Sequence, residues 1–260
     1  MSMRQVPDKP RILVTNDDGI DAPGLAILTR IAKDMSDDVW VVAPLTNQSG
    51  TSHALTIQRP LRVRSYGERR YAIDGTPTDC VMIAMQALLE DQRPDLVLSG
   101  INRGANVADD VTYSGTIGAA MEATLFDVPA IALSQAYREL DSIPWETAEA
   151  FSAQAVAHVL SAGFPPGVLY SVNFPSCDPD AVSGFVAVRH GQRKLGDDIQ
   201  QRVDPRGDPY YWIGHMRTKT WREPGTDVAA MAAQEIAITP LQMNLSDVAA
   251  LSALESQLTG

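Results

Sequence analysis

The sequence predicts an α/β protein with a three-layer, Rossmann-like core, in which helices cover both faces of a mostly parallel sheet. Short apolar runs rich in β-branched residues alternate along the chain with segments whose apolar residues recur at helical spacing. This alternation is typical of parallel sheets that are covered on both faces. It stops after Phe174. We therefore expect a core over residues 1–175, followed by an irregular C-terminal excursion over residues 176–260.

The first half of the chain begins with a strand–helix–strand unit. Apolar runs at residues 11–15 and 39–43 predict two buried strands. The segment 23–35 between them predicts a helix, because it opens with Pro23 and then places apolar residues three and four positions apart. Short alternating segments between residues 55 and 73, with a turn at Gly67, predict an antiparallel insertion.

Helix-start signals and further apolar runs predict the remaining elements. Thr76 and Pro77 are typical of a helix N-terminus, and this helix should continue to about Glu90. Further strands are expected at 95–99, 130–134 and 168–172, further helices at 114–126, 144–161 and 246–258, and short β pieces at 184–189 and 235–239. The aromatic run Tyr210–Trp212 in the C-terminal excursion fits either a contact with a neighbouring subunit or a local hairpin.

Composition excludes several classes of protein. The 260 residues are 45% hydrophobic and 20% charged, which is typical of a globular protein and excludes intrinsic disorder. The 32 acidic residues outnumber the 21 basic ones, and the formal net charge is −11. This balance argues against a nucleic-acid groove or an anionic membrane surface, since both require positive potential. An anionic substrate would have to be met by a cation or by backbone dipoles.

The chain lacks the usual signals for export. Residues 1–10 are polar, unlike a signal peptide, and no window reaches the ~18 consecutive apolar residues of a membrane span. Cys80 and Cys177 lie far apart in the sequence and have neither CxxC nor zinc spacing. Two isolated thiols are typical of a reducing compartment. We therefore expect a cytoplasmic protein.

Polar loops follow several of the predicted strands. In open α/β sheets, ligands bind outside the carboxyl ends of the strands, and parallel strands end at one edge. Four polar segments fall at this edge: Asn16–Gly19, Asn47–Gly50, Gly100–Asn106 and Tyr113–Thr116. We therefore expect them to converge on one site.

The adjacent carboxylates Asp17 and Asp18 are the first candidate for chemistry. They repel each other unless a cation lies beside them, and Mg²⁺ or Mn²⁺ prefers oxygen ligands. Ser49 and Asn102 can supply neutral oxygens at the same edge. The alternative is a solvated turn, because Asp and Gly are turn formers. The position of the pair directly after the first strand favours one divalent metal ion, Mg²⁺ or Mn²⁺.

The segment Ser114-Gly115-Thr116 is the second candidate. At a helix start it offers free backbone N–H groups, two hydroxyls and the positive end of the helix dipole, which suit a phosphate. Alternatively, Ser114 is only an N-cap. Other chemistries lack their signatures, since the chain has no HExxH motif, G-x-S-x-G elbow, Walker loop or post-strand G-x-G-x-x-G.

These segments resemble the survival protein SurE family of metal-dependent phosphatases that act on nucleoside monophosphates. The resemblance covers most of the chain, from Arg11 to about Leu245. The matching motifs are Ile12–Ile20, Ala22–Gly24, Val42–Pro44 with Ser49–Gly50, Gly75–Cys80, Ser99–Asn102 with Gly104 and Asn106, Tyr113–Thr116, Asp204–Gly207, Tyr211–Gly214, Gly225–Asp227 and Ile238–Leu241. Each motif is weak alone, but so many in one order are highly specific.

The resemblance implies a Rossmann-like core whose C-terminal excursion is exchanged between the subunits of a homodimer or homotetramer. It assigns the metal to Asp17, Asp18, Ser49 and Asn102. It places Asn106 and Ser114-Gly115-Thr116 beside the substrate phosphate, and we expect Asn16 and Gly50 to contact substrate as well. The chain departs from the family pattern at Arg103, where a small residue is common, and at Leu241–Leu245, where a His and an Asp are common.

The predicted function is that of a divalent-metal-dependent phosphomonoesterase, a 5'-nucleotidase that hydrolyses nucleoside monophosphates to nucleoside and phosphate. Asp17 or Asp18 is the candidate catalytic base, although an aspartyl-phosphate intermediate remains an alternative. Two other classes of function stay open. The site would serve equally in a non-catalytic nucleotide-binding sensor, or its acidic edge would bind Ca²⁺ in a structural oligomer.

Overall fold

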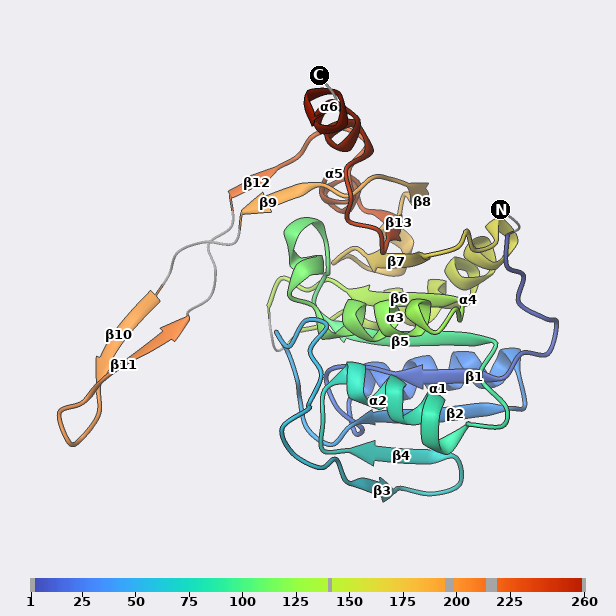
Figure 1. Ribbon diagram of the computed structural model, residues 1–260. Helices are drawn as coiled ribbons and strands as arrows, with labels where there is room; N and C mark the ends of the chain where they lie inside the picture. The colour runs from blue at the N-terminus through green and yellow to red at the C-terminus, as the bar shows by residue number, and fades with distance from the viewer. Residues whose placement is uncertain (1–2, 140–141, 195–198, 214–218, 259–260) are drawn as a thin grey trace.

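A nine-stranded sheet forms the centre of the protein. The computed structural model describes residues 3–139, 142–194, 199–213 and 219–258. Within these residues the strand order is β3-β4-β2-β1-β5-β6-β7-β13-β8 (Figure 1). Six neighbouring strands run parallel: β4 (Arg70–Ile73), β2 (Val39–Pro44), β1 (Ile12–Thr15), β5 (Leu96–Arg103), β6 (Ala130–Gln135) and β7 (Val168–Phe174). The predicted α/β class with a mostly parallel sheet is confirmed.

At both edges of the sheet, the strands run antiparallel to these six. At one side, β3 (Val63–Ser65) pairs antiparallel with β4, as predicted for the insertion with its turn at Gly67. At the other side, β13 (Glu235–Gln242) pairs antiparallel with β7, and β8 (Gly184–Ala187) pairs parallel with β13. The central sheet therefore extends past residue 175 and takes in two strands of the predicted C-terminal excursion.

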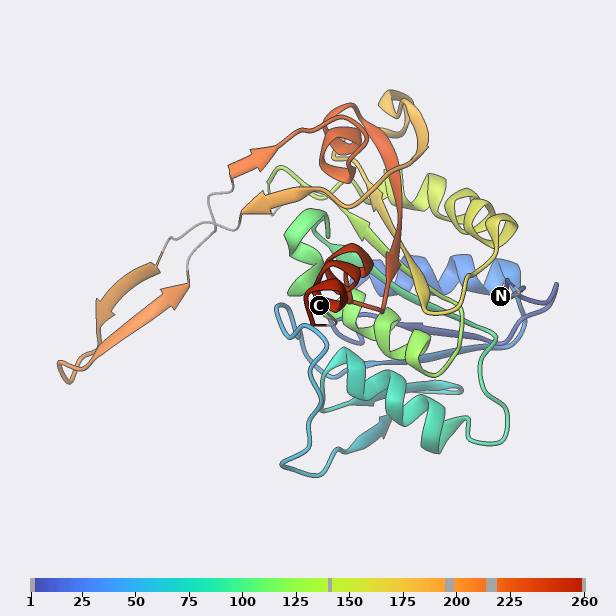
Figure 2. The same ribbon diagram turned by 45° about the horizontal axis from the view of Figure 1, so that its top comes forward.

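Helices cover both faces of the sheet and so complete the three layers (Figure 2). α1 (Pro23–Met35) and α4 (Trp145–Ala162) share one core cluster with Ile12 and Val14 of β1. On the opposite face, α2 (Pro77–Ile83) and α3 (Gly115–Leu125) form a second core cluster with Leu13 of β1. Successive side chains of a strand point to opposite faces, so a strand buried on both faces must be apolar throughout. None of the helices in the described part of the chain is long and apolar enough to cross a membrane.

Two elements differ from the predicted ones. The helix that starts at Pro77 is capped by Thr76 as expected, but it ends at Ile83 and continues only as a π-helical turn over Ala84–Leu88. The strand predicted to end at residue 99 continues to Arg103, with a shift of register against β6 between Ser99 and Asn102. Glycine and polar residues in 100–103 favour a loop locally, but the sheet buries Ile101 completely.

The C-terminal excursion contains a long two-part ribbon that projects from the body (Figure 1). β9 (Gln192–Lys194) pairs with β12 (Lys219–Trp221), and β10 (Ile199–Val203) pairs with β11 (Pro209–Ile213). The aromatic run Tyr210–Trp212 lies in this local hairpin. Two helices complete the chain, the short α5 (Asp227–Ala232) and the terminal α6 (Val248–Leu258).

Gly24 determines how closely α1 packs on the sheet. A Cβ atom at this position would lie 1.9 Å from the carbonyl oxygen of Ile101 and 3.1 Å from the ring of Trp145. We predict that Gly24→Ala lowers the free energy of unfolding by about 1–3 kcal/mol, because a backbone carbonyl cannot move aside as a side chain would. Urea denaturation measures the change. The exposed Ala26→Ser on the same helix is the control and should stay within about 0.5 kcal/mol. Equal stability of Gly24→Ala and wild type would contradict the packing.

Candidate functional site

The four polar segments converge at the carboxyl edge of the sheet, around a cavity of about 500 Å³. The lining residues come from the ends of β1, β2, β5 and β6 and from the start of α3. They are Asp17, Asp18, Ser49, Gly50, Asn102, Arg103, Gly104, Ala105, Asn106, Asp110, Tyr113, Ser114 and Tyr137. The structure therefore brings together all of the predicted site residues except Asn16, Gly115 and Thr116, which do not line this cavity.

Asn16 shapes the turn that presents the two carboxylates. Its side chain is fully buried, donates to the carbonyl oxygen of Gly19 at 3.0 Å and accepts from the Gly19 N–H at 3.3 Å. Gly19 adopts a φ of +106°, which a residue with a side chain rarely takes. The structure thus places Asn16 as a support of the turn.

Asp17 lies almost completely buried at the end of β1, with 3% of its surface exposed. Its Oδ1 accepts a hydrogen bond of 2.6 Å from the Thr116 hydroxyl. The pKa of Asp17 is raised from its usual 3.8 to about 6, chiefly by burial and also by the charge of Asp18, while the Thr116 hydrogen bond acts in the opposite direction. The ionised form of Asp17 is therefore less stable in this site than it would be in water.

Asp18 is held by the backbone of the next loop. Its Oδ2 accepts from the Arg103 N–H at 2.9 Å. Burial also raises the pKa of Asp18, while the hydrogen bond and the positive charge of Arg103 lower it. Among the salt bridges of the described residues, none joins Asp17 or Asp18 to a basic side chain.

The loop after β2 is fastened to both sides of the site by backbone hydrogen bonds. The Gln48 N–H donates to the Asp17 carbonyl oxygen at 2.7 Å, and the Ser52 N–H donates to the Tyr113 carbonyl oxygen at 3.0 Å. Between them, the Ser49 N–H donates to Oδ1 of Asn47 at 2.8 Å. Together with a longer hydrogen bond of 3.5 Å from Nδ2 of Asn47 to Oδ1 of Asp18, these bonds place Ser49 and Gly50 at the cavity.

The first turn of α3 approaches the carboxylates more closely than a side chain would permit. A Cβ atom on Gly115 would lie 2.9 Å from the Cβ of Asp17 and 3.0 Å from Pro77. Thr116 is fully buried and donates its hydroxyl to Asp17. The Thr116 side chain thus supports the Asp17 carboxylate. Ser114 accepts from the Ile117 N–H at 3.1 Å, so it is an N-cap that also lines the cavity.

Asn102 and Asn106 extend from the end of β5 across the cavity. The side-chain amide of Asn102 donates to the Gly104 carbonyl oxygen at 2.8 Å, which leaves its own carbonyl oxygen as the atom suited to a cation. Asn106 donates from Nδ2 to the Ser134 hydroxyl, and its backbone N–H donates to Oδ1 of Asn173, both at 2.8 Å. Asn173 was not among the predicted site residues. Its place at the carboxyl end of a predicted strand is the signal that would have identified it.

The oxygen atoms at this edge fit a hard divalent cation. In the part of the chain that the structure describes, no three His, Cys, Asp or Glu side chains are grouped so that they could hold a metal ion. A ligand set here would therefore combine two carboxylates with neutral oxygens, as Mg²⁺ and Mn²⁺ accept. The raised pKa of both aspartates and the lack of an ion-paired basic side chain are the properties expected of a pair that a cation would neutralise.

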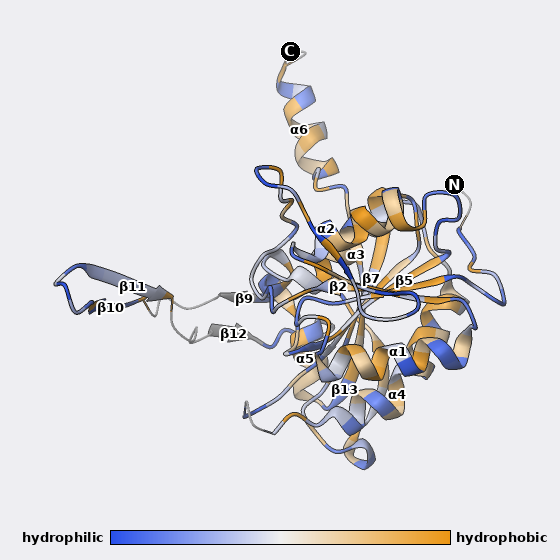
Figure 3. Cartoon of the chain, turned by 90° about the horizontal axis from the view of Figure 1, so that it is seen from below, coloured by the Kyte–Doolittle hydropathy of each residue, from blue (hydrophilic) through white to orange (hydrophobic). Residues whose placement is uncertain are grey.

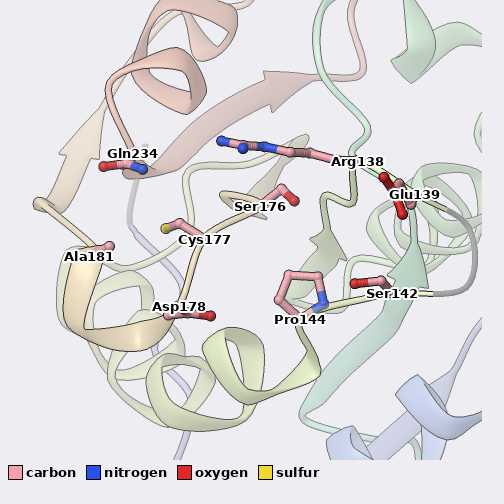
Figure 4. A pocket seen from close by; sticks show the side chains of 9 residues that line it. All are labelled: Arg138, Glu139, Ser142, Pro144, Ser176, Cys177, Asp178, Ala181 and Gln234. Carbon is pink, nitrogen blue, oxygen red and sulfur yellow. The ribbon is translucent and has the colours of Figure 1, made fainter.

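A second cavity of about 480 Å³ lies beside α4 and contains none of the predicted site residues. Arg138 extends across it toward Gln234, and Glu139 and Asp178 supply its other charges (Figure 4). Opposite charges are thus mixed along its wall. It lacks the adjacent, unpaired carboxylates that distinguish the cavity at Asp17.

The pKa of Asp17 predicts how the metal-free protein responds to pH. Because the folded-state pKa of about 6 exceeds the usual 3.8, the folded protein binds a proton more readily than the unfolded chain. Stability from this group is therefore greatest below about pH 4 and falls as pH rises to about 6, by a total of about 3 kcal/mol. We expect Asp17→Asn to stabilise metal-free protein at pH 8 and to have little effect at pH 4. Thermal unfolding in chelator at both pH values measures this, and a destabilised Asp17→Asn protein at pH 8 would contradict it.

Comparison with known proteins agrees with the geometry of this edge. The family model described as "Survival protein SurE" matches residues 12–197. A protein of Paramagnetospirillum magneticum named 5'-nucleotidase SurE is 50% identical over 250 residues, 96% of either chain. One of the same name from Methylobacterium sp. (strain 4-46) is 51% identical over 240 residues, 91% of this chain and 95% of its own. The crystal structure of the SurE protein from Aquifex aeolicus superposes with a TM-score of 0.81 at 35% identity, covering 95% of this chain and 98% of that one. Family model, close relatives and fold thus coincide, and the chain belongs to the survival protein SurE family.

Proposed function

We propose that the protein is a 5'-nucleotidase, a phosphoric monoester hydrolase that converts nucleoside monophosphates to nucleoside and phosphate with the help of a divalent metal ion. Relatives named 5'-nucleotidase SurE, at about 50% identity over nearly the whole chain, support this activity. The observation that carries it is the pair of adjacent carboxylates at the carboxyl edge, buried Asp17 and half-buried Asp18, which form no salt bridge with a basic side chain of the described residues.

Asp17, Asp18, Ser49 and Asn102 would hold one ion, Mg²⁺ or Mn²⁺. When bound, the ion would neutralise phosphoryl oxygens and act as a Lewis acid toward phosphorus. These four residues line one cavity. Three of them are already oriented by internal hydrogen bonds: Asp17 by the Thr116 hydroxyl, Asp18 by the Arg103 N–H and Asn102 by the Gly104 carbonyl oxygen. Such preorganisation lowers the cost of ordering the ligands.

The remaining residues of the edge would bind and orient the phosphate. The N-terminus of α3 at Ser114 faces the cavity with the positive end of its dipole, and Asn106 is fixed beside it by Ser134 and Asn173. Asp17 or Asp18 would accept a proton from the attacking water. The oxygen of water then bonds to phosphorus, the bond from phosphorus to the nucleoside oxygen breaks, and that oxygen takes up a proton. Positioning and charge neutralisation supply most of the rate.

Release of phosphate from AMP tests the function. We expect wild-type protein with Mn²⁺ to release phosphate, EDTA to stop the reaction, and Asp17→Asn to lose at least ~1,000-fold in kcat/KM, because it removes a charged ligand. Asp34→Asn, on the exposed face of α1, is the control and should retain full activity. If AMP binds in calorimetry but the wild-type protein releases no phosphate, the protein is a nucleotide-binding sensor instead.

Metal affinity should depend on the ionisation of Asp17. A cation competes with the proton, so below about pH 6 the affinity for Mn²⁺ should fall about tenfold per pH unit. Thr116→Val removes the hydroxyl that lowers the pKa of Asp17 and should move this decline to higher pH. Calorimetric titration with Mn²⁺ between pH 5 and 8 measures both. An identical pH profile in Thr116→Val would show that the hydroxyl does not tune the site.

Arg103 is the one Lys or Arg among the residues that line the cavity in the described structure. Its guanidinium would meet the substrate phosphate, since the other described side chains that line the cavity are neutral or acidic. We expect Arg103→Ala to raise KM for AMP by about 10- to 100-fold, the value of a charged hydrogen bond, and Arg103→Lys to fall between. Both variants keep the backbone N–H that holds Asp18, so their Mn²⁺ affinity should differ little from wild type. Unchanged steady-state KM in Arg103→Ala would exclude this contact.

We also propose that the C-terminal excursion over residues 176–260, two strands of which complete the sheet of the core over residues 1–175, forms the interface of a homodimer or homotetramer. Large apolar side chains are exposed on the β10–β11 hairpin and along α6, which stands clear of the body (Figure 3). They are Ile199, Val203, Tyr210, Tyr211, Trp212, Ile213, Val248, Leu251, Leu254 and Leu258. Apolar surface of this extent is typical of protein–protein contacts.

We also propose that the protein is cytoplasmic. Cys80 and Cys177 are free thiols, as is usual for proteins of a reducing compartment.

A further inference from the structure

The carboxylate of Asp227 joins the C-terminal segment to the loop that follows β5. It belongs to the motif Gly225-Thr226-Asp227, has 1% of its surface exposed and accepts three backbone hydrogen bonds. The donors are the N–H groups of Ala108 at 2.9 Å, Gly191 at 2.9 Å and Val228 at 2.8 Å. Two of these donors lie far from Asp227 in the sequence. The carboxylate therefore has a role beyond the start of α5.

Ala108 has an unusual backbone conformation that these contacts maintain. Its φ is +51°, a left-handed value that costs free energy in any residue with a Cβ atom. Asp227 binds its N–H, and Nε2 of His190 lies 2.7 Å from its carbonyl oxygen. Because a carbonyl oxygen only accepts, Nε2 must carry the proton. Both polar backbone groups of Ala108 are thus bound by residues of the C-terminal segment.

Ala108 lies between two residues that line the cavity, so its backbone conformation affects the site. It begins the 3₁₀ helix Ala108–Thr112, which connects Asn106 to Ser114, and both of these residues line the cavity. Figure 1 shows α5 and β9 beside this turn, above the carboxyl edge of the sheet. A change of φ at Ala108 would redirect the chain between the two residues. None of the proposed metal ligands lies in this segment.

We propose that Asp227 and His190 are positioning residues, which impose the left-handed conformation of Ala108 and thereby place Asn106 and the start of α3 around the substrate phosphate. This inference rests on the proposed phosphomonoesterase function. It assigns a purpose to the Gly225–Asp227 motif, whose residues do not line the cavity. Without the two contacts, Ala108 would relax to a negative φ and the phosphate contacts would move out of place.

The experiment combines loss of each contact with relief of the strain. Asp227→Asn replaces one acceptor oxygen by an N–H donor that faces other donors, and His190→Leu removes the donor to Ala108. Each should lower kcat/KM for AMP by about 100-fold through misplacement of the loop, while the Kd for Mn²⁺ by calorimetry stays within about twofold. Adding Ala108→Gly should restore about tenfold in both, because glycine adopts a positive φ without a steric cost. His190→Gln keeps an N–H donor and should retain more activity than His190→Leu.

A matched control separates positioning from general destabilisation. Asp79 is a second buried aspartate that accepts backbone N–H groups, from Thr56 at 2.9 Å and Thr76 at 2.8 Å, but it does not contact Ala108. Asp79→Asn should lower the melting temperature, and Ala108→Gly should restore no activity to it. Wild-type kcat/KM in both Asp227→Asn and His190→Leu would overturn the inference, as would equal rescue of Asp79→Asn. Absence of phosphate release from wild-type protein would instead refute the proposed function, and the wild-type measurement distinguishes the two failures.

Discussion

The arrangement of the site depends on one electrostatic constraint: buried Asp17 lies next to half-buried Asp18, and neither carboxylate forms a salt bridge with a basic side chain in the described part of the chain. Asp17 is nearly inaccessible to water, and its pKa is raised to about 6 by that burial and by the charge of Asp18. Neutral donors, the Thr116 hydroxyl and the Arg103 N–H, limit the cost without neutralising the charge. The negative charge of the site therefore stays largely uncompensated, and a bound metal ion would neutralise it.

Close approach of the backbone, and not charge pairing, assembles the surrounding loops. Gly115 lets the first turn of α3 lie against Asp17, and backbone hydrogen bonds from Gln48 and Ser52 hold the loop after β2 between them. Because these contacts use groups that every residue has, they leave the side chains of the edge available for a ligand. In an acidic protein, the phosphate site that we propose would depend on helix dipoles, amides and Arg103, the one arginine among the described residues that line the cavity.

The C-terminal excursion takes part in the site as well as projecting from the body. β13 and β8 join the central sheet beside β7, and the residues next to β9 and α5 bind Ala108. The same segments lead into the exposed ribbon that we propose as an oligomer contact.

The order of the elements, the parallel sheet and the edge lined by Asp17, Asp18, Ser49 and Asn102 could all be predicted from the sequence. These features follow from local periodicity and from the rule that parallel strands end together, so no long-range contact had to be known. The role of each side chain at this edge, as a support or as an exposed group of the site, depends on tertiary contacts. Thr116 supports a carboxylate and Asn16 shapes a turn, although both residue types suit a ligand equally well in sequence.

The same limit explains the continuation of β5 and the function of the Gly225–Asp227 motif. Ile101 follows a glycine and precedes polar residues, and only the neighbouring strand and α1 make it a buried strand position. Asp227 contacts Ala108 across 119 positions of sequence. Hydrogen bonds between such distant residues depend on how the helices and the sheet pack together. Local sequence patterns do not predict that packing.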